Sequence, residues 1–206
     1  MPVFPLPGTV LFPGTAVPLH IFEPRYLAMV DACMADNAAL AVVMQQPGGD
    51  AAAARVPIYD VACGGRIVHA ERLPQGRLNI LVHGLSRLRL VHELPLIDGY
   101  RRFMTSRIET TSDEVDDREM ARLQSCVLSL RSSAAGRDDQ LVEVLASTSD
   151  PVALTDILSA VLVSDPERRQ LLLETQSLRK RVALLIDAAA EVMVRVVETD
   201  SQAKLN

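Results

Sequence analysis

The distribution of proline divides the chain into two parts that must fold differently. Six of the twelve prolines lie before residue 25, and only Pro151 and Pro166 lie beyond residue 95. A proline inside a helix removes a backbone hydrogen bond and clashes with the preceding turn, so long helices are excluded near the chain start. The later part is open to helices that begin at its two prolines. The sequence therefore predicts a β-rich first half and a helical second half.

In the first half, apolar and polar residues alternate over short runs. Leu78, Ile80 and Val82 alternate with polar neighbours after a turn at residues 74–76, which indicates a half-buried strand. A helix is expected from Pro24 to Ala35, because proline suits the first helical turn. Its apolar face is expected to contain Tyr26, Met29, Val30 and Cys33. Further strands are expected at residues 40–44, 66–73, 86–94 and 100–108.

In the second half, two acid–proline pairs mark helix starts. Asp150 precedes Pro151, and Asp165 precedes Pro166. Each aspartate can accept hydrogen bonds from the unpaired N–H groups of a helix that starts at the proline. Apolar residues from Leu178 to Val196 recur at intervals of four and three, which predicts one long helix. Two further helices are expected at residues 115–132 and 139–145, which completes a helical bundle.

Charge changes at the same place as proline use. Residues 1–112 contain 10 basic and 9 acidic residues, whereas residues 113–206 contain 11 and 17. We therefore expect two domains, a β-rich domain over 1–112 and a helical bundle over 113–206. The net charge of −5 argues against a generic nucleic-acid binder.

The motifs of common enzyme classes are missing from the sequence. There is no GxxxxGK[ST] phosphate loop, no GxSxG, and no CxxC or HExxH. The only lysines are Lys180 and Lys204, which disfavours Ser–Lys catalysis. Four residues of the β-rich half have side chains that can bind a metal, namely Cys63, His69, His83 and His92. Their spacing in the sequence matches no zinc-binding pattern. We expect no catalytic residue, no metal and no cofactor.

The first 22 residues contain no charged side chain, which by itself suggests a signal peptide or membrane span. However, five prolines interrupt that stretch, and no basic segment precedes it. Three cysteines, an odd number, do not form a disulfide framework. The expected protein is cytoplasmic, with reduced thiols and no membrane partner.

Arginine is concentrated between residues 66 and 107, a stretch that contains eight arginines and three acidic residues. Arg87 and Arg89 are expected to share one face of a strand, which then forms a solvated basic surface. Such a surface could bind nucleic acid through Arg66, Arg77, Arg87 and Arg89. The region has only two rings, Tyr100 and Phe103, so stacking platforms for single strands are few.

The start of the chain resembles a known family. The resemblance rests on the following segments: Phe4-Pro5-Leu6, Val10-Leu11-Phe12-Pro13-Gly14, Pro18-Leu19-His20-Ile21-Phe22-Glu23-Pro24-Arg25-Tyr26, Gly65-Arg66-Ile67, Gly76-Arg77-Leu78, and Gly84-Leu85-Ser86-Arg87-Leu88-Arg89. Together they resemble the amino-terminal substrate-binding domain of Lon proteases. Residues 150–193 resemble the helical bundle that follows it.

The resemblance implies an α+β fold, with a PUA-like β-barrel domain followed by a helical bundle. It also implies recognition of unfolded or tagged polypeptides. The ATPase and Ser–Lys peptidase of Lon lie further along its chain, so this sequence looks like a free-standing, non-catalytic version of the domain. Unfolded or partly folded polypeptides are the expected partners, with a protease or chaperone as a further partner.

Two interpretations of the opening signature stay open on the sequence alone. Its apolar residues could simply fill the barrel, while Glu23 and Arg25 order the corner at Pro24. Alternatively, Phe4, Phe12, Phe22 and Tyr26 form an apolar peptide groove with Arg25 at its rim.

The expected function is a non-enzymatic polypeptide-binding module for protein quality control, acting as a proteolysis adaptor or a holder of damaged protein. One alternative is RNA binding through the arginine-rich sheet face. Another is a structural interaction module that joins a complex through the helix from Leu178 to Val196. The oligomeric state is left open, because that apolar stripe could be buried within its own bundle.

Overall fold

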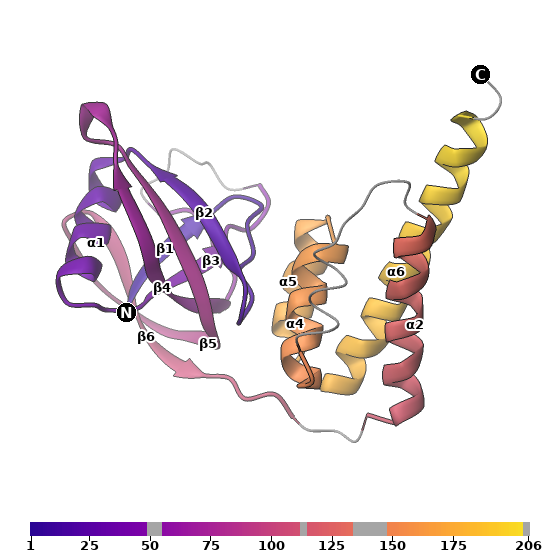
Figure 1. Cartoon of the computed structure of the whole chain (residues 1–206). Coiled ribbons are helices and arrows are strands. Elements are labelled where there is room, and N and C mark those ends of the chain that lie inside the picture. The colour runs from indigo at the N-terminus through magenta and orange to yellow at the C-terminus, as the bar shows by residue number, and fades with distance from the viewer. Residues whose placement is uncertain (49–54, 112–114, 134–147, 204–206) are drawn as a thin grey trace.

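The β-rich half contains six strands, one α-helix and a short 3-10 helix at Pro74–Gly76 among the residues that the structure describes. The structure is a computed structural model that describes residues 1–48, 55–111, 115–133 and 148–203. The strands are β1 (Pro2–Leu6), β2 (Ala16–Ile21), β3 (Leu40–Met44), β4 (Val61–Arg72), β5 (Leu78–Ile97) and β6 (Tyr100–Arg107). Helix α1 (Pro24–Ala35) lies between β2 and β3 and covers one side of the barrel (Figure 1).

Strand β5 closes the sheet into a barrel because it is long enough to pair with three other strands. The strand order is β2-β5-β4-β3-β1-β6, and β6 pairs again with β5. β2 pairs with β5 over residues 78–83, and β6 pairs with it over residues 88–97. Since β4 occupies the opposite edge of β5, β2 and β6 follow one another along the same edge. The ring runs β5-β4-β3-β1-β6, with β2 as an attached edge strand.

Helix α1 has the bounds and the buried face that the sequence predicts. Pro24 stands in its first turn, and Tyr26, Met29, Val30 and Cys33 are its buried residues. They join a core that includes inward-facing strand residues such as Phe4, Val42 and Ile80. Burying this apolar face stabilises the helix more than its own propensity does.

The largest difference from the sequence prediction lies in β5, which is one strand of 20 residues rather than two strands separated at Gly84. Gly84 donates a backbone hydrogen bond to Thr15 O (2.8 Å) and accepts one from Gly14 N (2.9 Å). The Thr15 side chain in turn bonds Phe12 O at 2.8 Å. The segment from Phe12 to Thr15 therefore occupies the stretch of the β5 edge between β2 and β6.

The second half is helical, as expected, with α2 (Asp117–Ser133), α4 (Pro151–Leu162), α5 (Pro166–Glu174) and α6 (Leu178–Ala203). Asp150 accepts hydrogen bonds from the N–H groups of Val152 and Ala153, and Asp165 accepts one from Arg168 N. Both predicted helix caps are thus confirmed. The expected helix at residues 139–145 lies outside the described residues. None of the described helices has the length and hydropathy to cross a membrane.

A buried ionic network joins the two halves, which Figure 1 shows side by side. Arg87 on β5 forms two hydrogen bonds with the carboxylate of Asp156 on α4, one of them at 2.8 Å. Arg87 Nε also donates to Leu173 O on α5 at 3.0 Å. Arg181 on α6 reaches the same carboxylate at 2.6 Å and Thr110 Oγ1 at 2.9 Å. All three charged residues are buried.

Apolar packing also crosses between the halves. One cluster of buried residues contains Phe12 and Cys63 of the barrel together with Leu158, Leu173 and Leu185 of the helices. A further hydrogen bond joins Gln170 Nε2 on α5 to Val61 O on β4 at 3.0 Å. The fold is α+β, as expected, and its helices pack on the barrel rather than apart from it. The predicted domain boundary near residue 112 falls between the end of β6 and the start of α2.

Replacing Gly84 with alanine is expected to destabilise the barrel. A Cβ at this position would lie 2.1 Å from Phe12 O and 3.2 Å from Cys63 Sγ, so the backbone of the 12–15 segment must move. Overpacking of this kind costs about 1–3 kcal/mol. The measurement is urea unfolding followed by circular dichroism. Gly14→Ala is the control, because the space around Gly14 is open and only its φ of +76° would destabilise the variant. Equal stability of Gly84→Ala and wild type would contradict the close approach of the 12–15 segment to Gly84.

Replacing Asp156 with alanine should cost about 3–5 kcal/mol of unfolding free energy, because two buried arginines would lose their counter-charge. Asp31→Ala is the matched control, since it removes an exposed carboxylate paired with Arg72 at 2.8 Å. Exposed pairs contribute about 0–1 kcal/mol. Denaturant midpoints of the two variants check the prediction, and similar losses in both would contradict it.

Candidate functional site

Three of the four rings in the expected peptide groove belong to the core instead. Phe4 and Tyr26 stack with ring centroids 4.4 Å apart, and both are buried. Phe12 is fully buried, and it begins the segment that is hydrogen-bonded to Gly84. Burial raises the pKa of the Tyr26 phenol above its ordinary value. These three rings fill the barrel, and only Phe22 presents its ring to solvent, with 63% of its surface exposed.

The signature around Pro24 has a structural role at the start of α1. Arg25 Nε donates to Glu23 Oε2 at 2.9 Å, so the two charges that flank Pro24 pair across it. The Arg25 guanidinium also lies over the Tyr26 ring, 4.6 Å from its centroid. Both contacts hold Arg25 in place while part of its side chain stays exposed. The pair of Glu23 and Arg25 and the contact with Tyr26 therefore order the start of α1.

Phe22 borders a shallow apolar depression on the outer face of β2, β4 and β5. The ring of His20 lies 6.1 Å from that of Phe22 and is hydrogen-bonded through Nδ1 to Asn79 Oδ1 at 2.8 Å. The depression has a volume of about 460 Å³, and it is lined by Pro18, Leu19, His20, His69, Asn79, Ile80 and Leu81. We call this depression together with Phe22 the Phe22 face. An exposed ring at the edge of an apolar hollow suits an apolar side chain of a peptide.

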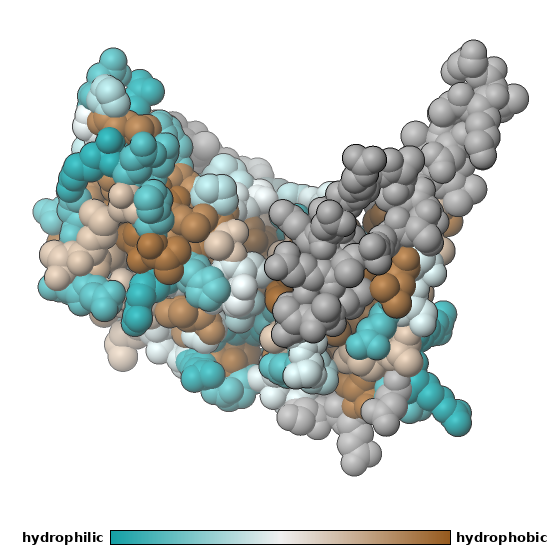
Figure 2. All heavy atoms as spheres, in the orientation of Figure 1, coloured by the Kyte–Doolittle hydropathy of each residue, from teal (hydrophilic) through white to brown (hydrophobic). Residues whose placement is uncertain are grey.

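A second cleft of about 430 Å³ lies between the barrel and the helices. Arg87 and Asp156 line it, while Leu85, Ile108 and Val152 add apolar surface. Arg87 and Asp156 already satisfy each other, so this cleft offers mixed polar and apolar walls without an available aromatic anchor. In the space-filling view the barrel and the helical half adjoin, and apolar residues gather on the barrel on the face in view (Figure 2).

The arginine-rich surface is smaller than the sequence suggests, and the expectation for Arg87 is wrong. Arg87 is buried against Asp156, whereas Arg89 is exposed, so the two do not form one solvated face. Arg101 pairs with Glu93 through two hydrogen bonds of 2.9 Å, which lower the pKa of Glu93. Among the described arginines between residues 66 and 107, three are exposed and have no ion-pair partner: Arg66, Arg77 and Arg89.

Nothing in the described part of the chain assembles a metal site. No group of three His, Cys, Asp or Glu side chains in those residues could hold a metal ion. His69 lies at the Phe22 face, and Cys63 is buried in the barrel. Burial raises the pKa of the Cys63 thiol to about 12, so this cysteine is protonated at neutral pH and is a poor nucleophile.

Comparison with known proteins identifies the family. The profile of the substrate-binding domain of ATP-dependent protease La (LON) matches residues 1–190. The chain belongs to the Lon substrate-binding domain family. The Lon protease of Anaeromyxobacter dehalogenans is 27% identical over 199 residues, which cover 91% of this chain and 22% of that protein. The Lon protease of Roseiflexus castenholzii is 30% identical over 190 residues, covering 88% of this chain and 23% of that protein.

Two solved structures share the fold. The Lon N-terminal domain protein from Xanthomonas campestris has a TM-score of 0.68 at 21% identity, covering 91% of this chain and 96% of that one. The N-terminal domain of Mycobacterium avium complex Lon protease has a TM-score of 0.70 at 21% identity, covering 92% and 97%. The chain thus matches the whole of these domains, but less than a quarter of the length of the two full-length relatives.

The sequence analysis of this Lon substrate-binding domain does not identify the buried carboxylate of Asp156. Asp156 sits inside an apolar helix, between Leu154 and Leu158, and an acid among apolar residues was an available signal. The Phe22 face was also missed as a surface, because its residues come from three strands whose neighbours only the barrel defines. Phe22 itself was among the predicted residues.

Thiol reactivity should separate the buried cysteines from the third. Iodoacetamide at pH 8 is expected to label the partly exposed Cys126 while Cys63 stays unmodified, because its thiol is buried and protonated. In denaturant all three cysteines should react. Peptide mass spectrometry checks both conditions, and rapid native labelling of Cys63 would rule out its assigned place in the core.

Proposed function

We propose that this chain is a non-enzymatic module that binds unfolded or damaged polypeptide segments through the Phe22 face. The observation that carries the proposal is the family match over residues 1–190 to a substrate-binding domain. Among the described residues of that domain, Phe22 is the aromatic residue with the most exposed side chain, and it borders an apolar hollow. Unfolded chains offer exposed apolar side chains, which such a surface can desolvate.

The Phe22 face favours extended chains over folded proteins. Strand β2 is an edge strand, so its outer side is not covered by another strand of the sheet. Pro18 lies in the middle of β2 and removes one backbone donor, which limits uncontrolled strand addition there. Recognition on this surface then depends on side chains entering the hollow, and suits many sequences that share apolar residues. Delivery of such clients to a protease or chaperone would make the module a proteolysis adaptor.

Truncation of Phe22 should weaken polypeptide binding. Phe22→Ala is expected to raise the Kd for a fluorescently labelled, permanently unfolded polypeptide about thirtyfold or more, because losing an aromatic anchor costs about 2 kcal/mol or more. Leu128→Ala is the matched control, since Leu128 on α2 is 50% exposed. Fluorescence anisotropy measures both. Equal affinity of wild type and Phe22→Ala would place the binding surface elsewhere, with Leu85→Ala then testing the cleft between the halves.

RNA binding is the second candidate function, and Arg66, Arg77 and Arg89 are the exposed residues that support it. It differs from polypeptide binding in its salt dependence, because phosphate contacts release counterions. A labelled RNA in the same titration separates the two. Binding to RNA alone, lost as salt rises and lost in Arg89→Glu, would favour this candidate over the polypeptide-binding one.

A further inference from the structure

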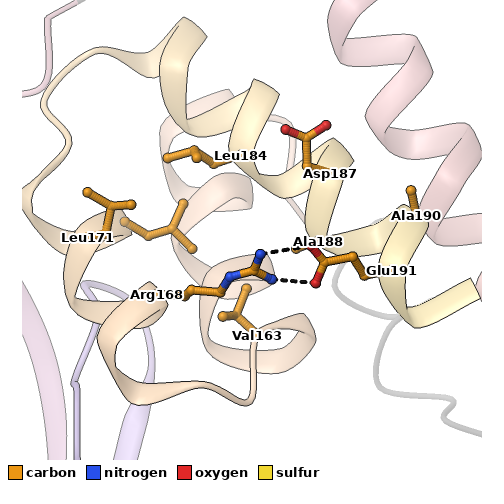
Figure 3. Close-up of a pocket in the computed structure, with 9 residues that line it drawn as sticks. Val163, Arg168, Leu171, Leu184, Asp187, Ala188, Ala190 and Glu191 are labelled. Atoms are coloured by element: carbon orange, nitrogen blue, oxygen red, sulfur yellow. Dashed lines mark hydrogen bonds and ion pairs between the residues drawn. The ribbon is translucent and has the colours of Figure 1, made fainter. Parts of the chain in front are cut away.

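A groove between α5 and α6 forms a second exposed apolar surface. It lies in the helical half of the chain, whereas the Phe22 face lies in the β-rich half. It has a volume of about 510 Å³ and contains Leu171, Leu172 and Leu184 together with Val163 and Ala188. Figure 3 shows Leu171 on one wall and Leu184 on the other. Leu171 is 49% exposed although its neighbours Leu172 and Leu173 are buried. An exposed leucine on the wall of a groove that holds further apolar side chains is the arrangement that receives a partner's apolar face.

The charges around this groove are mostly acidic. Arg168 on α5 and Glu191 on α6 form a two-hydrogen-bond ion pair across it, one bond being 2.7 Å, and so neutralise each other (Figure 3). Asp187 stands on the α6 wall, and no arginine or lysine of the described residues pairs with it. The ion pair with Glu191 and the charges of Asp165 and Asp187 raise the pKa of Arg168.

The acidic character extends beyond the groove. A neighbouring polar hollow of about 350 Å³ shares Arg168 and Glu191 with it and adds Ser164 and Asp165. The half as a whole carries 11 basic and 17 acidic residues. A second copy of this chain would bring a like charge to the groove through the same half.

We propose that the α5–α6 groove docks an amphipathic helical segment of another protein, whose apolar row enters the groove and whose lysines or arginines face Asp187 and Asp165. The α5 wall of the groove has 9 residues and is about 13 Å long, which an apolar row of about two to three helical turns can fill. The flanking basic residues complement the groove's charge, which selects this partner over an acidic helix of equal apolarity. This docking surface is separate from the Phe22 face and goes beyond the proposed function.

Two designed peptides of equal length test the proposal on the full chain. One has a leucine face flanked by lysines, and the other has the same leucine face flanked by glutamates. The lysine peptide is expected to bind saturably in fluorescence anisotropy, at least about tenfold more tightly than the glutamate peptide. Phe22→Ala should leave this binding unchanged, so failure here and failure of the proposed function are distinguishable. Equal binding of both peptides would overturn the proposal.

Matched variants then locate the binding. Asp187→Lys should weaken the lysine peptide about fivefold or more, whereas Glu71→Lys, the same charge change at an exposed residue of β4, should change it less than about twofold. Leu171→Asp should weaken binding strongly and Leu128→Asp should not. Equal effects of the two lysine variants would show attraction to net charge alone and overturn the proposal. So would a homodimer, seen in sedimentation, that dissociates in Leu171→Asp.

Discussion

The contact between the barrel and the helices depends on one buried carboxylate. Asp156 accepts hydrogen bonds from Arg87 of the barrel and Arg181 of α6, and so connects three elements that are distant in the sequence. Two arginines against one aspartate leave an excess positive charge in the interior, and burial lowers the pKa of Arg181 to about 10. Arg181 is still protonated at neutral pH. Removing the carboxylate would leave two unpaired charges, so this position tolerates few substitutions.

The length of β5 allows the sheet to close into a barrel. The same strand carries Arg87, which joins the buried ionic network with Asp156. Because β2, the Phe12–Thr15 segment and β6 follow one another along one edge, a single strand defines both the Phe22 face and the position of Arg87. Gly84 permits the close approach in the middle. The same strand therefore connects the outer surface, the core and the contact with the helices.

The exposed apolar surfaces lie at two places with different chemistry. The Phe22 face combines an aromatic ring with an apolar hollow, which suits varied unfolded segments. The α5–α6 groove combines leucines with acidic neighbours, which suits one class of basic amphipathic helix. A domain that recognises substrates and also docks on another protein needs two such surfaces that do not compete. Their position in opposite halves allows both to be occupied together.

The sequence by itself determined the local structure and the family. Proline placement, alternation and acid–proline caps are local signals, so α1 and the starts of α4 and α5 could be predicted from them. Only the tertiary structure decided which phenylalanines of the opening segment and which arginines of β5 are buried. Phe4 and Phe22 look alike in the sequence, but the barrel encloses one and exposes the other. Arg87 and Arg89 differ for the same reason, because α4 and α5 cover only Arg87. Contacts between segments that are distant in the chain produce no periodic pattern in the sequence, so the sequence does not predict them.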